Sequence, residues 1–259
     1  HSMERRLYAD TKKSPQVRWM TARIVRMAKA IMSKRPGGGE GRNGIHVVDV
    51  GGGRGDLSLA VAAALRPESR VTVIDTNSES LSAGRSRARE EGLLGRMEFI
   101  DEDIEKVVSS SRTTGGGGEG EEGVLESCDL VIGLHSCGGL GEFAITLAIE
   151  IGASFLVCTC CFNSNPHLAI LTRGWAAEPG SGIERGHQQA RFSVPIPVPA
   201  VDRRTIETLS RLAEKSTAVT RRAMQVINGI RLSAVEEMFA KRHPGKRIKL
   251  DQKMFPEQF

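Results

Sequence analysis

The chain has 259 residues, of which 39% are hydrophobic and 4% aromatic, and its formal net charge is +5. This length predicts one large domain, or one domain with an appended segment, and the hydrophobic fraction is sufficient for a packed core. No apolar run reaches 18 residues, which excludes a transmembrane helix, and no charged and apolar leader opens the chain, so we do not expect secretion. The five cysteines do not form the spaced pairs of a disulfide framework, and we expect a reducing cytosolic or nuclear compartment.

The charge is unevenly distributed along the chain. Residues 1–42 hold 11 basic and 3 acidic side chains, residues 43–201 hold 12 and 21, and residues 202–249 hold 12 and 5. An acidic middle is therefore flanked by two basic segments. Such asymmetry indicates either a polyanionic partner or Arg-rich helix faces that are simply solvated.

The first basic segment predicts a helix. Ser14-Pro15 has the residue types of a helix N-cap and first helical position. Apolar residues then recur at steps of three and four and form one stripe, which consists of Val17, Met20, Ile24, Met27 and Ile31. The helix is expected to end at Arg35-Pro36, and the glycine-rich residues 36–44 form a flexible linker.

From residue 45 onward, strands alternate with helices. Apolar runs predict five strands, at residues 45–50, 71–75, 97–100, 129–134 and 153–160, and helices are expected at 57–65 and 78–92. Buried strands separated by helices predict an α/β fold with a doubly wound, mostly parallel sheet.

The remaining segments are predicted from their composition. Residues 109–123 are rich in Ser, Gly and Glu, and we expect a mobile surface loop there. A Pro-marked connection follows residue 161, and two basic helices are expected at 203–216 and 219–242, the first capped by Asp202. Residues 246–255 are assigned one late strand.

The strongest motif is VVDVGGGRGDL at residues 47–57, which falls at the first strand-to-helix turn. Gly51, Gly53 and Gly55 form a G-x-G-x-G pattern, in which the missing Cβ atoms let a ligand approach the backbone. A dinucleotide-binding motif requires a third glycine one position later, where this chain has Asp56. The motif therefore favours a different nucleoside ligand.

Three acidic residues complete the predicted nucleoside site. Asp75 ends the second strand, where a carboxylate accepts hydrogen bonds from ribose hydroxyls. Asp49 is placed to hold the glycine loop or, through a water, an ammonium group of the ligand. Asp103 and Ile104 follow the third strand, next to the expected adenine edge. Each acid alone is better explained as a helix cap or a solvated turn. The three together, at the ends of three successive strands beside the glycine loop, predict a nucleoside site.

These residues resemble class I S-adenosylmethionine-dependent methyltransferases. GLHSCGGLGE at 133–142 and SFLVCTCCFN at 154–163 are further similar to one methyltransferase-domain family, which includes tRNA acceptor-stem 2′-O-methyltransferases and the methyltransferase domain of the glutathione S-transferase C-terminal-domain-containing protein. The resemblance covers about residues 45–165 and implies a Rossmann-like fold, S-adenosylmethionine as the cofactor and S-adenosylhomocysteine as the product. It divides the chain into an N-terminal helix and linker, 1–44, and a methyltransferase domain, 45–259.

The predicted cofactor-binding residues are Asp49, Gly51, Gly53, Gly55, Asp75, Thr76, Asp103, Ile104, Leu134 and His135. His135 is also the candidate catalytic base, because it is the one evident group of suitable pKa at the carboxyl edge of the sheet. The alternative is that its ring bonds a loop carbonyl or closes the cofactor pocket.

Cys137 and Cys161 are the further catalytic candidates. A thiolate that attacks a cytosine ring is one interpretation. The residues before Cys137 depart from the Asp-Ala-Pro-Cys pattern of enzymes that use this chemistry. A zinc site is a third interpretation, which we do not favour because Cys160 and Cys161 point to opposite faces of a strand. Cys128 and Cys158 are interpreted as small buried hydrophobes, and no metal is expected.

The basic segments favour structured RNA as the methyl acceptor, since they can contact a phosphate backbone. One Tyr and two Trp supply few stacking platforms for single-stranded bases, so a duplex read by its shape fits better. A protein or small-molecule methyltransferase and a non-catalytic domain that binds the cofactor or a partner remain alternatives. The candidate phosphate contacts in the second basic segment are Arg203, Arg204, Arg211, Arg221, Arg222, Arg231, Lys246 and Arg247.

Overall fold

The computed structural model describes residues 13–35, 44–113, 125, 127–136, 140–159, 162, 203–215 and 218–253. The chain forms two compact units. The sheet unit comprises His1–Ser136, Phe143–Thr159 and Lys253–Phe259, and the helical unit comprises Cys137–Glu142 and Cys160–Gln252.

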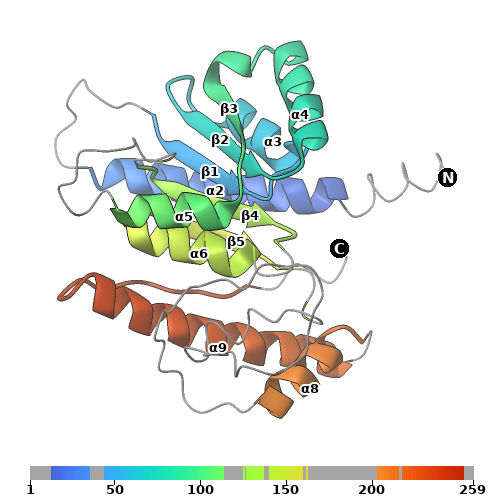
Figure 1. Cartoon of the computed structure of the whole chain (residues 1–259), viewed down its shortest axis with the longest axis vertical. Coiled ribbons are helices and arrows are strands. Elements are labelled where there is room, and N and C mark those ends of the chain that lie inside the picture. Colours follow the sequence, from blue (N-terminus) through green and yellow to red (C-terminus); the bar gives the residue numbers. More distant parts are fainter. Residues whose placement is uncertain are drawn as a thin grey trace. The chain divides into compact units, whose positions relative to one another are not determined.

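The sheet unit contains five parallel strands in the order β3-β2-β1-β4-β5 (Figure 1). Their bounds are β1 His46–Val50, β2 Arg70–Asp75, β3 Met97–Asp101, β4 Leu130–Leu134 and β5 Ser154–Cys158. This arrangement confirms the predicted doubly wound parallel sheet, and all five predicted strands are present. The order runs outward from β1 in both directions, so the carboxyl ends of β1 and β4 lie side by side at the point where ligands bind such sheets.

Helices cover both faces of the sheet. The helices of the sheet unit are α2 Ser14–Ser33, α3 Asp56–Ala64, α4 Ser78–Glu90 and α5 Ile104–Thr113, with the short 3-10 turn η2 Leu94–Arg96. A further helix, α6 Leu140–Ile151, follows β4, and neither α5 nor α6 was predicted. In Figure 1, α5 and α6 lie on the viewer's side of the sheet and α3 lies behind it.

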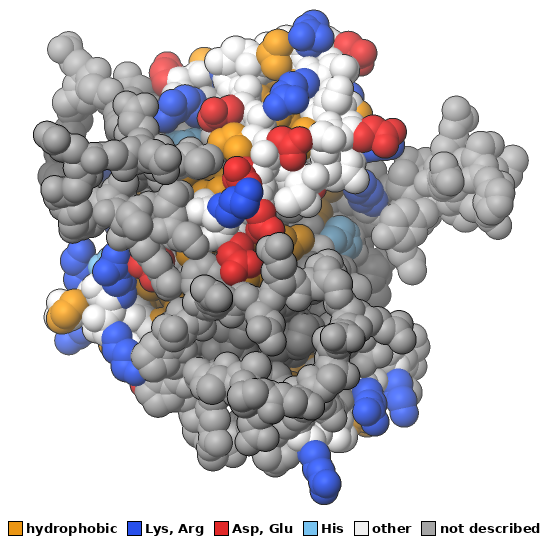
Figure 2. Space-filling view, viewed as in Figure 1, with side chains coloured by type: hydrophobic (Ala, Val, Ile, Leu, Met, Phe, Trp, Pro, Cys, Tyr) orange, Lys and Arg blue, Asp and Glu red, His pale blue; other side chains and the backbone are white. Residues whose placement is uncertain are grey.

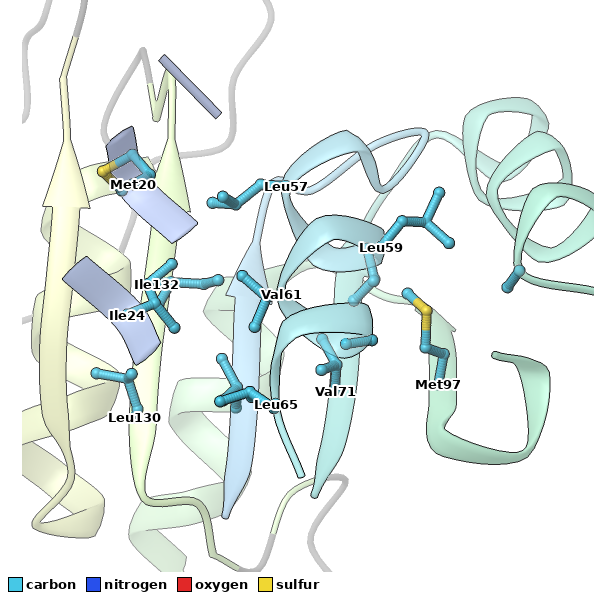
Figure 3. Close-up of a cluster of buried hydrophobic side chains, with 14 of the residues drawn as sticks. Met20, Ile24, Leu57, Leu59, Val61, Leu65, Val71, Met97, Leu130 and Ile132 are labelled. Atoms are coloured by element: carbon cyan, nitrogen blue, oxygen red, sulfur yellow. The ribbon is translucent and has the colours of Figure 1, made fainter. Parts of the chain in front are cut away.

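The main core lies between the sheet and α2, α3 and α4 (Figure 3). Met20 and Ile24 of α2 point toward Leu57 and Val61 of α3, and Ile132 of β4 lies beneath them. All five side chains are almost completely buried. Burying a side chain of this size contributes about 1.5–3 kcal/mol. The predicted apolar stripe is therefore what attaches the first basic helix to the sheet.

Two details of α2 refine the prediction. The helix begins at Ser14, and its N-cap is Lys13, which makes no side-chain cap hydrogen bond. At its other end, Arg35 donates to the backbone oxygen of Gly44 at 2.9 Å and to Oδ1 of Asp129 at 2.6 Å. Asp129 Oδ2 in turn accepts the backbone N–H of His46 at 2.8 Å. These bonds hold the end of α2 to the first residues of β1 and β4.

Two of the predictions for irregular or late segments are wrong. Residues 109–113, expected to begin a loop, belong to α5, because Val107 and Val108 bury its apolar face and extend the helix. The other residues of that predicted loop, 114–123, lie outside the described residues. Residues 246–253, part of the expected late strand, are described and form no strand. Lys246, Arg247 and Lys249 are exposed there, while Ile248 and Leu250 are half-buried, and the segment pairs with none of the described strands.

The helical unit contains α8 Arg203–Ala213 and α9 Ala218–Arg242, which confirm the two predicted basic helices. Their facing sides, together with Phe162, form a second core, whose helical members are Ile206, Ala213, Ala223 and Ile227. In the described parts of the chain, no helix is long and apolar enough to cross a membrane.

Candidate functional site

The glycine loop after β1 has a backbone that only glycine adopts readily. Gly51, Gly53 and Gly55 have φ values of +72°, +52° and +73°. The N–H of Gly51 donates to the oxygen of Ile74 at 2.8 Å, and that of Gly55 donates to the oxygen of Gly52 at 2.9 Å. The loop is thereby anchored to β2 and turns directly into α3.

Gly52 is a further required glycine that the motif spacing did not identify. A Cβ built there would lie 2.8 Å from Oδ2 of Asp49 and 2.8 Å from a methyl carbon of Val73. The position therefore needs glycine because of its neighbours and not because of its φ. The pattern G-x-G-x-G contains no signal for this, since the clash involves a residue of the adjacent strand.

Asp75, at the end of β2, receives the glycine loop. Its Oδ2 accepts the N–H of Gly53 at 2.9 Å, and its Oδ1 accepts the N–H of Asn77 at 2.9 Å. Asn77 also caps α4 by accepting the N–H of Ser80 at 2.9 Å. Because each carboxylate oxygen can accept more than one hydrogen bond, Asp75 keeps acceptor capacity for a ribose hydroxyl. Its carboxylate is held in place before any ligand arrives.

Asp103, the acidic candidate after β3, does not contact the glycine loop as Asp75 does but bonds within its own turn. Asp103 is exposed, and its Oδ1 accepts the N–H of Glu105 at 2.8 Å at the start of α5. The side chain of the following residue, Ile104, is only 5% exposed and packs inward, whereas Thr76 is exposed next to Asp75. Asp103 thus has a cap role of its own, and the contact of these three residues with a ligand stays a prediction.

Asp49 is a buried acid in the middle of the sheet unit. The residue is 1% exposed, and its Oδ2 accepts a short hydrogen bond from the hydroxyl of Ser58 in α3. Burial raises the pKa of Asp49 to about 7, the Ser58 hydroxyl opposes this shift, and the nearby charge of Asp75 adds to it. Its other oxygen, Oδ1, is buried and has no hydrogen-bond partner among the residues that the structure describes.

His135 follows β4 directly and has an unusual backbone. Its φ is +59°, which makes it the one residue other than glycine with a positive φ in the described part of the chain. Such a conformation in a non-glycine residue is strained and is concentrated at functional sites. Burial lowers the pKa of His135, and the positive charge of Lys13 lowers it further. The imidazole is consequently neutral at physiological pH, as a proton acceptor must be.

Ser136 folds back against the end of β4. Its N–H donates to the oxygen of Cys158 at 3.3 Å, and its hydroxyl occupies the space where a Cβ of Gly133 would lie. The glycine in the predicted motif is thus required by the serine three positions later. Both His135 and Ser136 are oriented by this tight turn.

Among the buried polar atoms that have no hydrogen-bond partner in the described structure, three lie at or just beyond the carboxyl ends of the neighbouring strands β1 and β4. They are Oδ1 of Asp49, Nε2 of His135 and Oγ of Ser136. Buried polar atoms without partners are uncommon in native proteins and need an explanation. Their position at the carboxyl ends of β1 and β4, beside the glycine loop, is explained by a polar ligand that supplies the missing hydrogen bonds.

The cysteines divide into described and undescribed positions. Cys137 and Cys161, the catalytic candidates, lie outside the described residues, as does Cys160. Burial raises the pKa of the Cys128 thiol to about 12, which agrees with a small hydrophobic role. Cys158 packs against the main core. In the part of the chain that is described, no group of three or more His, Cys, Asp or Glu is placed to hold a metal ion.

The fold and the glycine loop together define a Rossmann-like domain of the kind that binds S-adenosylmethionine. A model of a methyltransferase-domain family matches residues 12–165, more than half of the chain. The chain therefore belongs to this methyltransferase-domain family. The family makes S-adenosylmethionine the cofactor, and three features of the structure fit it: the positive φ of the glycine loop, the oriented carboxylate of Asp75 and the unsatisfied oxygen of Asp49.

Curated relatives match over a shorter stretch. The chain is 39% identical over 66 residues to the ubiquinone/menaquinone biosynthesis C-methyltransferase UbiE of Sinorhizobium fredii and 36% identical over 66 residues to that of Pseudomonas putida. Each match covers 26% of this chain and 26% of the relative. The chain thus spans about a quarter of the length of these relatives.

Solved structures match at low sequence identity. TrmN from Thermus thermophilus is 22% identical with a TM-score of 0.30, and the match covers 48% of this chain and 31% of TrmN. An S-adenosylmethionine-dependent O-methyltransferase from Thermotoga maritima is 17% identical with a TM-score of 0.37, and the match covers 56% of this chain and 44% of that one.

Proposed function

We propose that this protein transfers a methyl group from S-adenosylmethionine to structured RNA and that His135 removes the proton from the acceptor. The observation that supports RNA is the exposure of basic side chains, with few acidic neighbours, on α2 and on the helical unit. When bound, the cofactor supplies an electrophilic methyl group. The protein's part is to align the acceptor with that methyl group and to accept the proton at Nε2 of His135, which is buried and unpartnered.

The solvent side of α2 supports contact with a polyanion. Arg18, Arg26 and Lys29 are exposed, and α2 contains no Asp or Glu to neutralise them. Phosphate contacts of this kind supply most of the affinity of proteins for nucleic acids, and they weaken as salt rises.

The helical unit carries a second group of exposed basic residues (Figure 2 shows Lys and Arg side chains over α8 and α9). These residues are Arg204, Arg211, Lys215, Arg222, Lys241, Arg242, Lys246, Arg247 and Lys249. One predicted phosphate contact is wrong: Arg231 is 5% exposed, because its guanidinium is paired with Glu142 inside the unit. The side chain of Arg203 lies outside the described residues.

Trp19 supports a duplex over single-stranded RNA. Its ring packs against the main core, and the guanidinium carbon of Arg23 lies 3.8 Å above the ring centroid. A ring that is half-buried and covered by an arginine does not provide a free face for a base. One of the few aromatic side chains of the chain is therefore already engaged within the protein.

A salt titration of RNA binding tests this function. Binding of a tRNA acceptor-stem duplex is measured by filter retention for the wild type, for K246Q/R247Q/K249Q, and for R66Q/R70Q/R89Q, which removes the same charge from exposed positions of the sheet unit. We expect a steep salt dependence in the wild type and in the control, and a slope lower by about one for each phosphate interaction removed in the first variant. A wild-type affinity that does not change with salt would refute the RNA proposal.

Methyl transfer itself is tested with labelled cofactor. Tritiated S-adenosylmethionine is incubated with total tRNA, with a protein extract and with a small-molecule extract, using the wild type and His135→Asn, since asparagine tolerates a positive φ. Incorporation into tRNA by the wild type only is the expected result. Incorporation into protein or small molecules would identify a different acceptor class, and the absence of all incorporation, with cofactor binding intact, would favour a non-catalytic domain.

A further inference from the structure

A buried ion pair in the helical unit joins two segments that lie far apart in the sequence. Arg231 of α9 donates from Nε to Oε1 of Glu142 at 2.8 Å, and its Nη2 lies 2.7 Å from the same oxygen. Its Nη1 donates to Oδ1 of Asn228 at 3.0 Å. Arg231 is 5% exposed and Glu142 is 4% exposed. The pair is therefore almost fully removed from water.

The same guanidinium lies against Phe162. Its central carbon is 5.4 Å from the centroid of the Phe162 ring, within the range of a cation–π contact. The backbone N–H of Phe162 donates to Oε1 of Glu214 at 3.1 Å, and its side chain is 2% exposed in the core of the helical unit. Phe162 is thus fixed by its ring and by its backbone.

Glu142 and Phe162 each lie close in the sequence to candidate catalytic residues. Glu142 lies in the first turn of α6, and in the sequence it comes shortly after His135 and Cys137. Phe162 directly follows Cys161 in the segment after β5. One arginine therefore contacts a residue that follows each of the two stretches of sequence in which the candidate catalytic residues lie.

Energetics argue against a role in stability alone. Burying two charges costs as much free energy as their attraction returns, and replacing such a pair with apolar residues of similar volume is often neutral or stabilising. An ion pair differs from an apolar contact in being directional. The planar guanidinium fixes the orientation of the carboxylate that it binds. A group of this kind is suited to hold two chain segments in one relative position.

We propose that Arg231 is a positioning residue for methyl transfer, which acts by fixing Glu142 at the start of α6 and Phe162 after β5. This inference rests on the proposed function, since it assigns the alignment of the acceptor to the chain around these two residues. Arg231 and Glu142 act without contacting substrate or cofactor. Cofactor binding depends on the glycine loop and is independent of the pair.

Hydrogen exchange provides a test that needs no methyl acceptor. The variants are E142Q, R231K and the double variant E142M/R231M, in which two apolar side chains replace the pair, and E236Q on the exposed side of α9 is the matched control. We expect faster amide exchange in the peptides that contain Glu142 and Phe162 in all three variants, and no change in E236Q. S-adenosylhomocysteine affinity, measured by calorimetry, stays at the wild-type value. Unchanged exchange at either peptide in the folded double variant would overturn the inference.

Kinetics then separate positioning from stability. With the tRNA acceptor, E142M/R231M is expected to keep the wild-type melting temperature and KM while its kcat falls on the order of 10- to 100-fold, because small misplacements have effects of that size. The R231K variant retains the positive charge but lacks the planar guanidinium. We expect its kcat to lie between that of the wild type and that of E142M/R231M. Recovery of kcat together with stability in the double variant would refute a positioning role. If even the wild type methylates no RNA, the proposed function fails, and the exchange experiment still decides the inference.

Discussion

Replacing Asp49 with asparagine tests the electrostatic role of this residue in the cofactor site. Burial raises the pKa of this carboxyl from 3.8 to about 7 in the folded protein. Between those values the folded protein keeps a proton that the unfolded chain has released, so the contribution of Asp49 to stability is present at low pH and is lost as pH rises toward 7. A shift of about 3 pKa units, at about 1.4 kcal/mol for each unit, corresponds to roughly 4 kcal/mol at pH 8.

The amide of the D49N variant cannot titrate, so the substitution removes this dependence. Its oxygen still accepts the hydroxyl of Ser58, while its NH2 group replaces the unpartnered oxygen at a pH-independent cost of about 1–3 kcal/mol. As the pH rises from about 4 to 8, the wild type should therefore lose roughly 4 kcal/mol of unfolding free energy that D49N does not lose. The stability of D49N relative to the wild type increases by the same amount.

Urea unfolding followed by circular dichroism at several pH values measures this difference, with the exposed Asp103→Asn as the control. Parallel pH profiles for D49N and the wild type would refute the reasoning. Calorimetry measures whether cofactor affinity also depends on the ionisation of Asp49. If Asp49 must be ionised to hold the cofactor's ammonium, S-adenosylmethionine affinity in the wild type decreases up to about tenfold for each pH unit below 7, whereas in D49N it is weak and independent of pH.

Three further predictions concern the same edge of the sheet and its surroundings. Gly53→Ala places a side chain at φ +52°, with its Cβ 3.7 Å from Oδ2 of Asp75, and we expect a backbone cost of about 1–2 kcal/mol and weaker S-adenosylhomocysteine binding by calorimetry. If His135 is the base, the rate of methyl transfer declines on the acid side with a midpoint below pH 6.5, and Lys13→Gln moves that midpoint upward, because Lys13 helps to lower the pKa of His135. An unchanged midpoint in K13Q would contradict this. Cys128, whose pKa is raised to about 12, should react with iodoacetamide only after unfolding, as mass spectrometry of the labelled peptides would show.

The parts of the fold that depend on local patterns were predictable. The strands are short apolar runs, and the glycine loop requires positive φ at three positions within a few residues of each other. The helix α2 was predicted from its apolar stripe, and its buried residues Val17, Met20 and Ile24 belong to that stripe. In these cases the residues that decide the structure are close together in the sequence.

The parts that were missed depend on distant partners. Gly52 is required because of Val73, and Asp49 has a raised pKa because α3 and the neighbouring strands bury it. Neither fact is visible in the spacing of the motif. The late strand failed for the opposite reason, since residues 246–253 have suitable residue types in part but no neighbour with which to pair among the described strands.

Arg231 shows most clearly why charge counts alone mislead. In the sequence it is one basic residue among many in the segment 202–249, and nothing nearby distinguishes it from Arg222, which is exposed. Its partner Glu142 is 89 positions earlier in the chain. The net charge of the basic segment therefore overstates its capacity for phosphate by the arginine that is used internally. Substituting Arg231 should leave the salt dependence of RNA binding unchanged, whereas substituting Arg222 should reduce it. Filter binding of E142M/R231M, which removes the positive charge at position 231, and of R222Q measures this. A salt dependence lowered in E142M/R231M and unchanged in R222Q would show that Arg231 contacts RNA.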